Sequence, residues 1–186
     1  RSGSFPFMKI ALLPLFLFSL CCLCAANWTV LVYMAADNNL AQSGKHNLNE
    51  MESATQPEGL NLVVQADFPG ERTKRYLIEQ DADPDHITSN VIKDMANTDS
   101  GDPNTLRDFI IWGRNRYPAE RYMLVIWAHG DSWYKGSKWI SPDDETSNPI
   151  GIANGELKSA LVGTGDWDIL LFDACSMQSV EIITEM

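Results

Sequence analysis

The chain has 186 residues, of which 45% are hydrophobic and 21% charged, the composition of a globular domain with its own core. Removing an N-terminal leader that contains Arg1 and Lys9 leaves 12 basic and 25 acidic residues, a formal charge of −13. Such a charge disfavours nucleic acid and anionic membranes as partners and favours basic peptides or cations, although it also serves solubility alone.

Residues 1–26 consist of seven upstream residues, 1–7, and a stretch from Met8 that has the layout of a secretory signal peptide. Lys9 opens a basic region, and residues 10–20 form an apolar stretch of 11 residues, which is too short to span a bilayer. Small residues then precede a cleavage site between Ala26 and Asn27. We therefore expect a bacterial protein that is secreted or periplasmic. The alternative is a lipid anchor on one of the leader cysteines, Cys21, Cys22 or Cys24.

The first half of the remaining chain predicts strands and one helix. Residues 28–35 form a continuous apolar run, typical of a strand covered on both faces. A helix is expected over 40–54 and a second strand over 59–67. The strand at 75–80 is expected to be antiparallel because its connection is short, and residues 81–100 are read as irregular.

The second half continues this alternation. A helix over 100–118 has Asp102 as its cap and Pro103 in its first turn. Residues 131–150 are read as a long loop, which in a compact domain is usually functional. The other predicted elements are a strand, a helix capped by Asn154, a strand and the start of a helix, at residues 121–130, 155–162, 166–175 and 177–186.

This order predicts an α/β fold with a mostly parallel sheet and helices on both faces. Ligands bind such sheets beyond the carboxyl ends of the strands, where His129 and Cys175 stand. One helix separates these two strands in the sequence, so we expect the strands to be neighbours. The chain stops inside a predicted helix, so we expect residues 27–186 to be the N-terminal part of a larger domain whose missing part would complete the sheet.

Cys175 is the only cysteine outside the leader. A single cysteine in an exported protein implies an intermolecular disulfide, an inert buried thiol or a reactive one. A free thiol has a pKa of about 8.5, and a nearby imidazole or helix N-terminus favours the thiolate. The helix predicted from Met177 and the imidazole of His129 would both act on it. The alternative for His129 is a strand-end histidine bonded to backbone.

Gly130 directly follows His129 and has no side chain to keep a substrate carbonyl away. Its N–H and that of Cys175 could form an oxyanion hole, which is worth about 3 kcal/mol per donor.

No metal site is predicted. The histidines and cysteines lack the spacing that zinc requires. Two acidic stretches, DPDH (83–86) and SPDDE (141–145), do not follow the EF-hand pattern and are read as solvated turns.

Three segments together resemble one family: WTVLVYMAADNNL (28–40), YMLVIWAHGDSW (122–133) and LLFDACSMQSVE (170–181). They are similar to clostripain-like cysteine peptidases, of the caspase-like clan that includes gingipains and legumain. The resemblance implies a caspase-like α/β/α sandwich, a His129–Cys175 dyad, an oxyanion hole at Gly130 and cleavage after Arg or Lys.

The resemblance also implies that Asp173 lies at the floor of the specificity pocket. A carboxylate two residues before the nucleophile lies on the same side of the strand and can pair with a guanidinium or ammonium group. The alternative is that Asp173 caps the next helix. Asp37 and Asn38 end the first strand beside the expected site, where they could orient the substrate or the His129 ring.

Family members are often zymogens cut between the histidine and the cysteine. Here the basic residues between 131 and 150 are Lys135 and Lys138, so we expect activation by cleavage after one of them. No cofactor is expected to be required, although some relatives use calcium. The partners would be protein or peptide substrates bound by a monomer. The competing interpretation is a non-catalytic caspase-like domain that binds basic peptides; a flavodoxin-like or receiver-like domain is disfavoured by the export signal.

Overall fold

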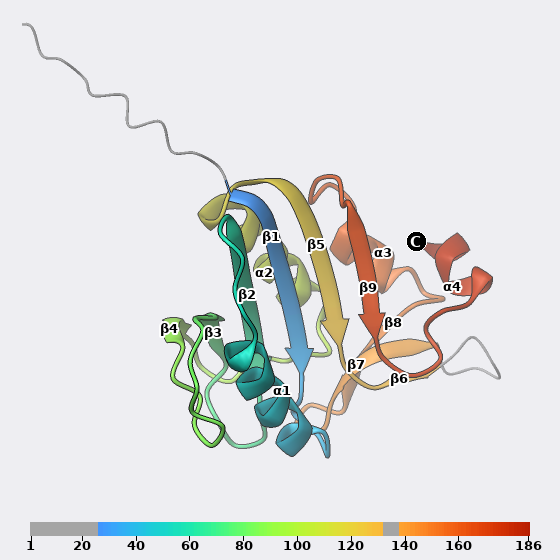
Figure 1. Cartoon of the computed structure of the whole chain (residues 1–186). Coiled ribbons are helices and arrows are strands. Elements are labelled where there is room, and N and C mark those ends of the chain that lie inside the picture. The colour runs from blue at the N-terminus through green and yellow to red at the C-terminus, as the bar shows by residue number, and fades with distance from the viewer. Residues whose placement is uncertain (1–25, 132–137) are drawn as a thin grey trace, which may run out of the picture.

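A mostly parallel six-stranded sheet forms the centre of the molecule (Figure 1). The structure is a computed structural model that describes residues 26–131 and 138–186. The strand order is β4-β3-β2-β1-β5-β9. The four parallel strands are β1 (Ala26–Ala35), β2 (Leu60–Asp67), β5 (Ala119–Trp127) and β9 (Ile169–Asp173). At one edge, β3 (Lys74–Leu77) pairs antiparallel with β2, and β4 (Asn90–Asp94) pairs antiparallel with β3.

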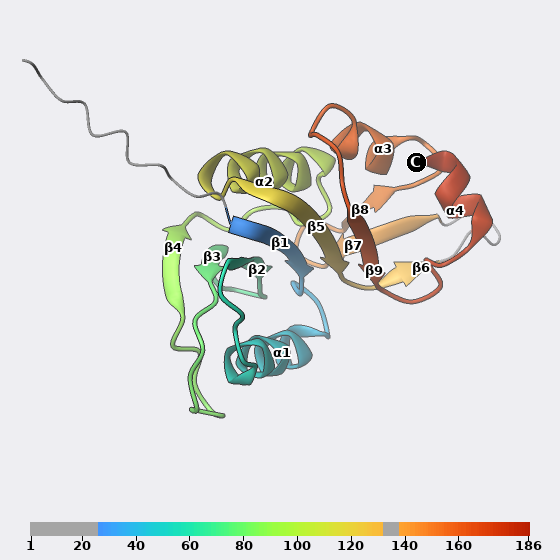
Figure 2. The same cartoon turned by 45° about the horizontal axis from the view of Figure 1, so that its top comes forward.

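Helices cover both faces of this sheet, as predicted. Figure 2 shows α1 (Ala41–Ser53) on one side, and α2 (Pro103–Arg116) and α3 (Glu156–Leu161) on the other. A short helix, α4 (Val180–Glu185), follows β9 and joins the α2 side of the core through Ile182.

The apolar run of β1 explains this three-layer arrangement. Successive side chains of a strand point to opposite faces. Leu31 and Tyr33 accordingly pack in the core on the α2 side, whereas Val32 and Met34 pack in the core on the α1 side. All four are buried, which confirms the prediction of a strand covered on both faces.

Helix α2 begins as predicted. Asp102 is its N-cap, and a carboxylate oxygen of Asp102 accepts a hydrogen bond of 2.8 Å from the N–H of Asn104. Pro103 occupies the first helical position, where its missing N–H costs nothing. The cap of α3 differs by one residue from the prediction, because Gly155 is the N-cap and Asn154 accepts from the N–H of Glu156.

The prediction of a loop over 131–150 was wrong for the described part of that range. A second, antiparallel sheet is formed there by β6 (Gly130–Asp131), β7 (Trp139–Asp143) and β8 (Asn148–Gly151). Its Ile140 and Ile150 are fully buried in the α2-side core. Turn residues dominate this stretch of sequence, so the two isolated isoleucines gave no recognisable strand period. Strand β4 was missed for a similar reason, because most of its residues are exposed.

The structure tests the prediction made for the C-terminal end of the chain but not the one made for the N-terminal end. The predicted leader lies outside the described residues except for Ala26, which begins β1. The last helix starts at Val180 with Ser179 as its cap, not at Met177. Its N-terminus is therefore further from Cys175 than the sequence suggested, and Asp173 does not cap it. Among the described residues, no helix is long and apolar enough to cross a membrane.

Candidate active site

Two neighbouring parallel strands bring His129 and Cys175 to the same edge of the sheet. In the register of β5 and β9, Trp127 is opposite Asp173, and the N–H of Ala128 donates to the carbonyl of Asp173 at 3.2 Å. His129 and Cys175 each stand two residues beyond this pair. They line one cavity of about 470 Å³, together with Leu40, Trp127, Ala128, Phe172, Asp173, Ala174 and Gln178. The predicted adjacency of the two strands is confirmed.

Cys175 lies on a tight turn and is a free, exposed thiol. Ser176 follows it with a φ of 58°, in the left-handed region that few side chains adopt. Met177 then returns to the core, where it is 1% exposed. The thiol is therefore presented to the cavity by a turn anchored on both sides, which argues against the inert buried cysteine that the sequence left open.

Gly130 packs directly against this turn. A Cβ atom at position 130 would lie 2.6 Å from the carbonyl oxygen of Cys175 and 2.8 Å from Cγ of Met177. Only glycine allows the two backbone segments to approach so closely. Its predicted place in an oxyanion hole with the N–H of Cys175 stays a prediction.

The His129 ring is held by a residue that the sequence analysis missed. Its Nε2 lies 2.6 Å from Oδ1 of Asn39. An amide oxygen only accepts hydrogen bonds, so Nε2 carries the proton and Nδ1 is left to accept one from a thiol. The sequence signal was present in DNNL (37–40), but the analysis chose the two polar residues before Asn39.

Asn38 and Asp37 are placed differently from Asn39. The Asn38 amide donates to the carbonyls of Ala35 at 3.1 Å and Pro142 at 3.0 Å, which fixes the turn after β1. Asp37 is fully buried. Neither residue lines the cavity that contains Cys175. Their predicted contact with substrate stays a prediction, and their surroundings favour a structural role.

Asp173 borders two cavities and is exposed at the end of β9. The first cavity also contains His129 and Cys175. The second, of about 340 Å³, is lined by Asn47, Glu50, Met51, Ala54, Trp127 and Asp173. Within the described part of the chain, no ion pair engages the Asp173 carboxylate. The indole N–H of Trp127 donates to Asn47 at 3.0 Å and thereby fixes the wall between the two cavities.

Of the two predicted activation sites, Lys135 and Lys138, the structure describes only Lys138. Lys135 lies outside the described residues. Lys138 immediately precedes β7, and its carbonyl accepts a 2.7 Å hydrogen bond from the N–H of Ile152. Cleavage after Lys138 would therefore require this pairing to open.

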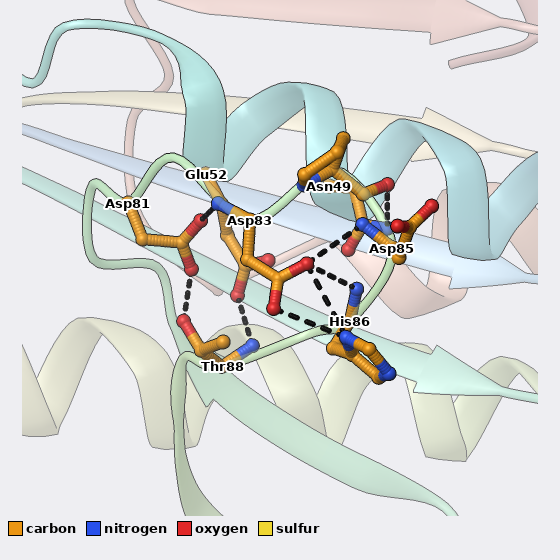
Figure 3. A network of polar contacts seen from close by, with 8 residues as sticks. Asn49, Glu52, Asp81, Asp83, Asp85, His86 and Thr88 are labelled. Atoms are coloured by element: carbon orange, nitrogen blue, oxygen red, sulfur yellow. Dashed lines mark hydrogen bonds and ion pairs between the residues drawn. The ribbon is translucent and has the colours of Figure 1, made fainter.

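The two acidic stretches have different environments. Figure 3 shows the loop that contains DPDH, where Asp83 accepts from the N–H groups of Asp85 and His86. The hydrogen bond from the N–H of Asp85 contributes most to holding the pKa of Asp83 below its usual value, and those from His86 add to it. This loop is an exposed turn that satisfies its own carboxylate, as predicted. The same interpretation was wrong for SPDDE, because Asp143 is 1% exposed and the N–H of the next residue, Asp144, donates to the carbonyl of Asp37 just after β1.

Removing the Asn39 side chain tests whether this residue orients the imidazole ring of His129. In Asn39→Ala, kcat should fall by about tenfold or more with little change in KM, since geometry and tautomer are lost and substrate contacts are kept. In Asn39→Asp, a carboxylate would favour the imidazolium, so the acidic limb of the kcat/KM profile should move to higher pH. Unchanged kcat and pH profiles in both variants would contradict this role.

Comparisons with known proteins agree with this geometry. The family model described as the clostripain family matches residues 32–186. Clostripain from Hathewaya histolytica is 28% identical over 182 residues, covering 83% of this chain and 35% of clostripain.

Solved structures give the same picture. A secreted C11 cysteine protease from Bacteroides thetaiotaomicron, in complex with an irreversible peptide inhibitor, has a TM-score of 0.72 and 32% identity over 86% of this chain and 46% of its own. An inactive zymogen C11 protease from Parabacteroides distasonis has a TM-score of 0.69 and 31% identity over 87% of this chain and 45% of its own. The chain thus spans less than half the length of these relatives. Their likeness confirms the predicted α/β fold.

Proposed function

This chain belongs to the clostripain family, and from that membership we propose that it carries the dyad of a cysteine endopeptidase that cleaves after Arg or Lys. The observation that carries the proposal is the convergence of His129 and the exposed Cys175 thiol on one cavity of about 470 Å³. The whole protein's activity is included in the proposal, because the chain covers 35% of clostripain.

The proposed reaction uses a neutral imidazole of His129 that is protonated at Nε2 and free to accept a proton at Nδ1. Nδ1 of His129 takes the proton of the Cys175 thiol, and the thiolate attacks the carbonyl carbon of the scissile bond. The N–H groups of Gly130 and Cys175 would stabilise the resulting oxyanion. The imidazolium returns its proton to the leaving amine as the C–N bond breaks, leaving a thioester. Water, deprotonated by the same imidazole, releases the acid and restores the thiol.

Preference for a basic side chain rests on the second cavity. Asp173 and Glu50 supply two carboxylates to a space of about 340 Å³, and Trp127 supplies an apolar wall. The stem of an Arg or Lys side chain can lie along the indole while its charge reaches a carboxylate. Glu50, on α1, was not found by the sequence analysis, because nothing in the sequence brings α1 beside the end of β9.

Activation and export complete the proposal. Cleavage after Lys135 or Lys138 would activate a zymogen, an interpretation compatible with the relative described as an inactive zymogen. A secreted relative likewise supports export of this bacterial protein. A monomeric state and no required cofactor, with calcium as an optional ligand, belong to the same proposal; a lipid anchor on a leader cysteine is the alternative to a soluble exported form.

A non-catalytic domain that binds basic peptides is the competing function. It shares the acidic cavity with the peptidase but has no use for a proton acceptor beside an exposed thiol. The position of the His129 ring, with Nε2 2.6 Å from Oδ1 of Asn39, therefore favours the peptidase.

The test uses the full-length protein and three fluorogenic peptides that are identical except for Arg, Lys or Asp before the cleaved bond. We expect turnover of the Arg and Lys peptides only, and its loss after alkylation of the thiol with iodoacetamide. Intact-mass analysis of the active sample should show a cut after Lys135 or Lys138. Binding of the basic peptides without turnover, even after the 131–150 segment is nicked, would instead identify the binding domain.

A further inference from the structure

We propose that Asp37, Asp67 and Asp143 form a binding site for a divalent cation, of which Ca²⁺ is the best fit. The site lies outside the dyad cavity, and none of the three residues lines it. The proposal does not depend on the proposed peptidase activity, because it concerns binding alone.

Three strand ends build the site. Asp67 ends β2, Asp143 ends β7, and Asp37 follows the end of β1. One carboxylate oxygen from each lies within 4.8 Å of the other two. The three side chains are 0%, 1% and 1% exposed for Asp37, Asp67 and Asp143. Carboxylates almost never gather in a buried place without a positive partner.

The hydrogen bonds leave oxygens free toward the centre of the cluster. Asp67 accepts from the hydroxyl of Thr73 at 2.7 Å, but its other oxygen has no hydrogen-bond partner. Both oxygens of Asp37 lack one. Asp143 accepts from the N–H groups of Ser100 and Thr146, each at 2.9 Å, which orients its carboxylate. A buried acceptor without a partner is costly, so these three orphaned oxygens point to a ligand.

The surrounding charges do not supply the missing partner. In the described ranges 26–131 and 138–186, no Lys or Arg makes an ion pair with the three carboxylates. The neighbours that act on them electrostatically include Glu145 and Asp144, which are also acidic.

The pKa values of Asp37 and Asp67 agree with the absence of a positive partner. Burial, with the nearby carboxylates, raises the pKa of Asp37 to about 6 and that of Asp67 to about 7. The nearby Asn97 amide, which donates to Glu145 at 2.5 Å, lowers the pKa of Asp37 in part.

The chemistry of the ligands selects the ion. Three carboxylates are hard oxygen donors, which suit Ca²⁺ and Mg²⁺ rather than softer metals. Ca²⁺ binds oxygens at about 2.3–2.6 Å, so two ligands on opposite sides of it are about 5 Å apart, whereas about 4.2 Å is the limit for Mg²⁺. Mg²⁺ gives up its water reluctantly and is rarely held by several protein carboxylates at once, so three buried carboxylates within 4.8 Å of one another favour Ca²⁺. Water would complete its coordination.

Loading this site would also stiffen the turn that carries Asn39. The carbonyl of Asp37 accepts from the N–H of Asp144 at 2.8 Å, and Asn39 is two residues further along. An ion would join these strand ends directly, which makes it a positioning element for the His129 ring.

The test is a binding measurement on the full-length protein carrying Cys175→Ala, so that proteolysis does not interfere. The protein is freed of metal with EDTA, transferred to chelator-free buffer and titrated separately with CaCl₂ and MgCl₂, using calorimetry and thermal unfolding. We expect one Ca²⁺ site and a Tm that rises with Ca²⁺ concentration, since the ion binds only the folded state. Mg²⁺ should bind more weakly.

Two isosteric variants decide where the ion binds. Asp37→Asn removes a buried charge without removing a hydrogen bond, so the metal-free protein should unfold at a higher Tm than its parent and lose the Ca²⁺-dependent rise. The matched control is Asp85→Asn in the exposed acidic loop of Figure 3, which should keep that rise. Asp67→Asn provides a second variant of the site, and it keeps an oxygen for Thr73.

The outcomes separate cleanly. No heat and no Tm change with either ion up to millimolar concentrations would overturn the proposal, whatever the protease assay shows. Loss of the Ca²⁺ effect in Asp85→Asn, with retention in Asp37→Asn, would place the ion in the exposed loop and would also overturn it.

Discussion

Replacing Cys175 by alanine is expected to reduce hydrolysis of an Arg peptide to background, a loss in kcat of at least about 10⁴-fold. The thiol is the proposed nucleophile, and no other cysteine lies in the described part of the chain. His129→Ala should cost about 10³-fold or more, because the thiol loses its proton acceptor and the leaving amine its donor. Initial rates measured at saturating substrate give both values.

A second readout separates the two roles. At pH 7, Cys175 of the His129→Ala variant should react with iodoacetamide more slowly than the native thiol, because its thiolate fraction is smaller. Gln178→Ala is the matched control, since this residue lines the same cavity and has no assigned proton-transfer role. Unchanged alkylation in His129→Ala, or near-native turnover in Cys175→Ala, would refute the dyad.

Replacing Asp173 by asparagine is expected to lower kcat/KM for Arg and Lys peptides by about 30- to 1,000-fold, the range for removing one partner of an enclosed charge pair. The side chain keeps its size, so the loss reports charge alone. Cleavage of a neutral peptide, however slow in the native enzyme, should not decrease. Steady-state kinetics with matched peptides provides the comparison.

The control for this change is Asp166→Asn, which removes an exposed carboxylate just before β9, at the opposite end of the strand. It should leave the ratio of basic to neutral substrates unaltered. Glu50→Gln should lower that ratio less than Asp173→Asn, because Glu50 lines only the second cavity. Equal ratios in the Asp173 variant and the native enzyme would exclude this carboxylate from substrate selection.

The elements carrying the dyad could be predicted because their signals are local. The buried strands have long apolar runs, and α2 begins with an Asp-Pro pair that satisfies its first turn. Parallel pairing then requires that residues following adjacent strands meet at one edge. The placement of His129 and Cys175 at one edge of the sheet could be predicted from these signals alone.

The remaining features depend on tertiary contacts that no local pattern encodes. Strands β7 and β8 are short and rich in turn residues, and their Ile140 and Ile150 are buried in the core cluster that also contains residues of α2 and α3. Asp143 looks like part of a solvated turn in the sequence, yet that second sheet carries it to Asp37 and Asp67. Asn39 and Glu50 were missed because their relation to the site depends on how the chain after β1 turns back over the sheet.

The turn after β1 has a consequence for when the protein becomes active. Asn38 is bonded to Pro142, 104 residues away, and Asn39 to His129, 90 residues away. Contacts between such distant segments form late, because a long stretch of chain must be closed before they can be made. In the proposed peptidase, the Cys175 thiol therefore lacks an oriented base until these segments have folded together. Long-range topology would thus delay the proposed proteolysis independently of any cleavage of the chain.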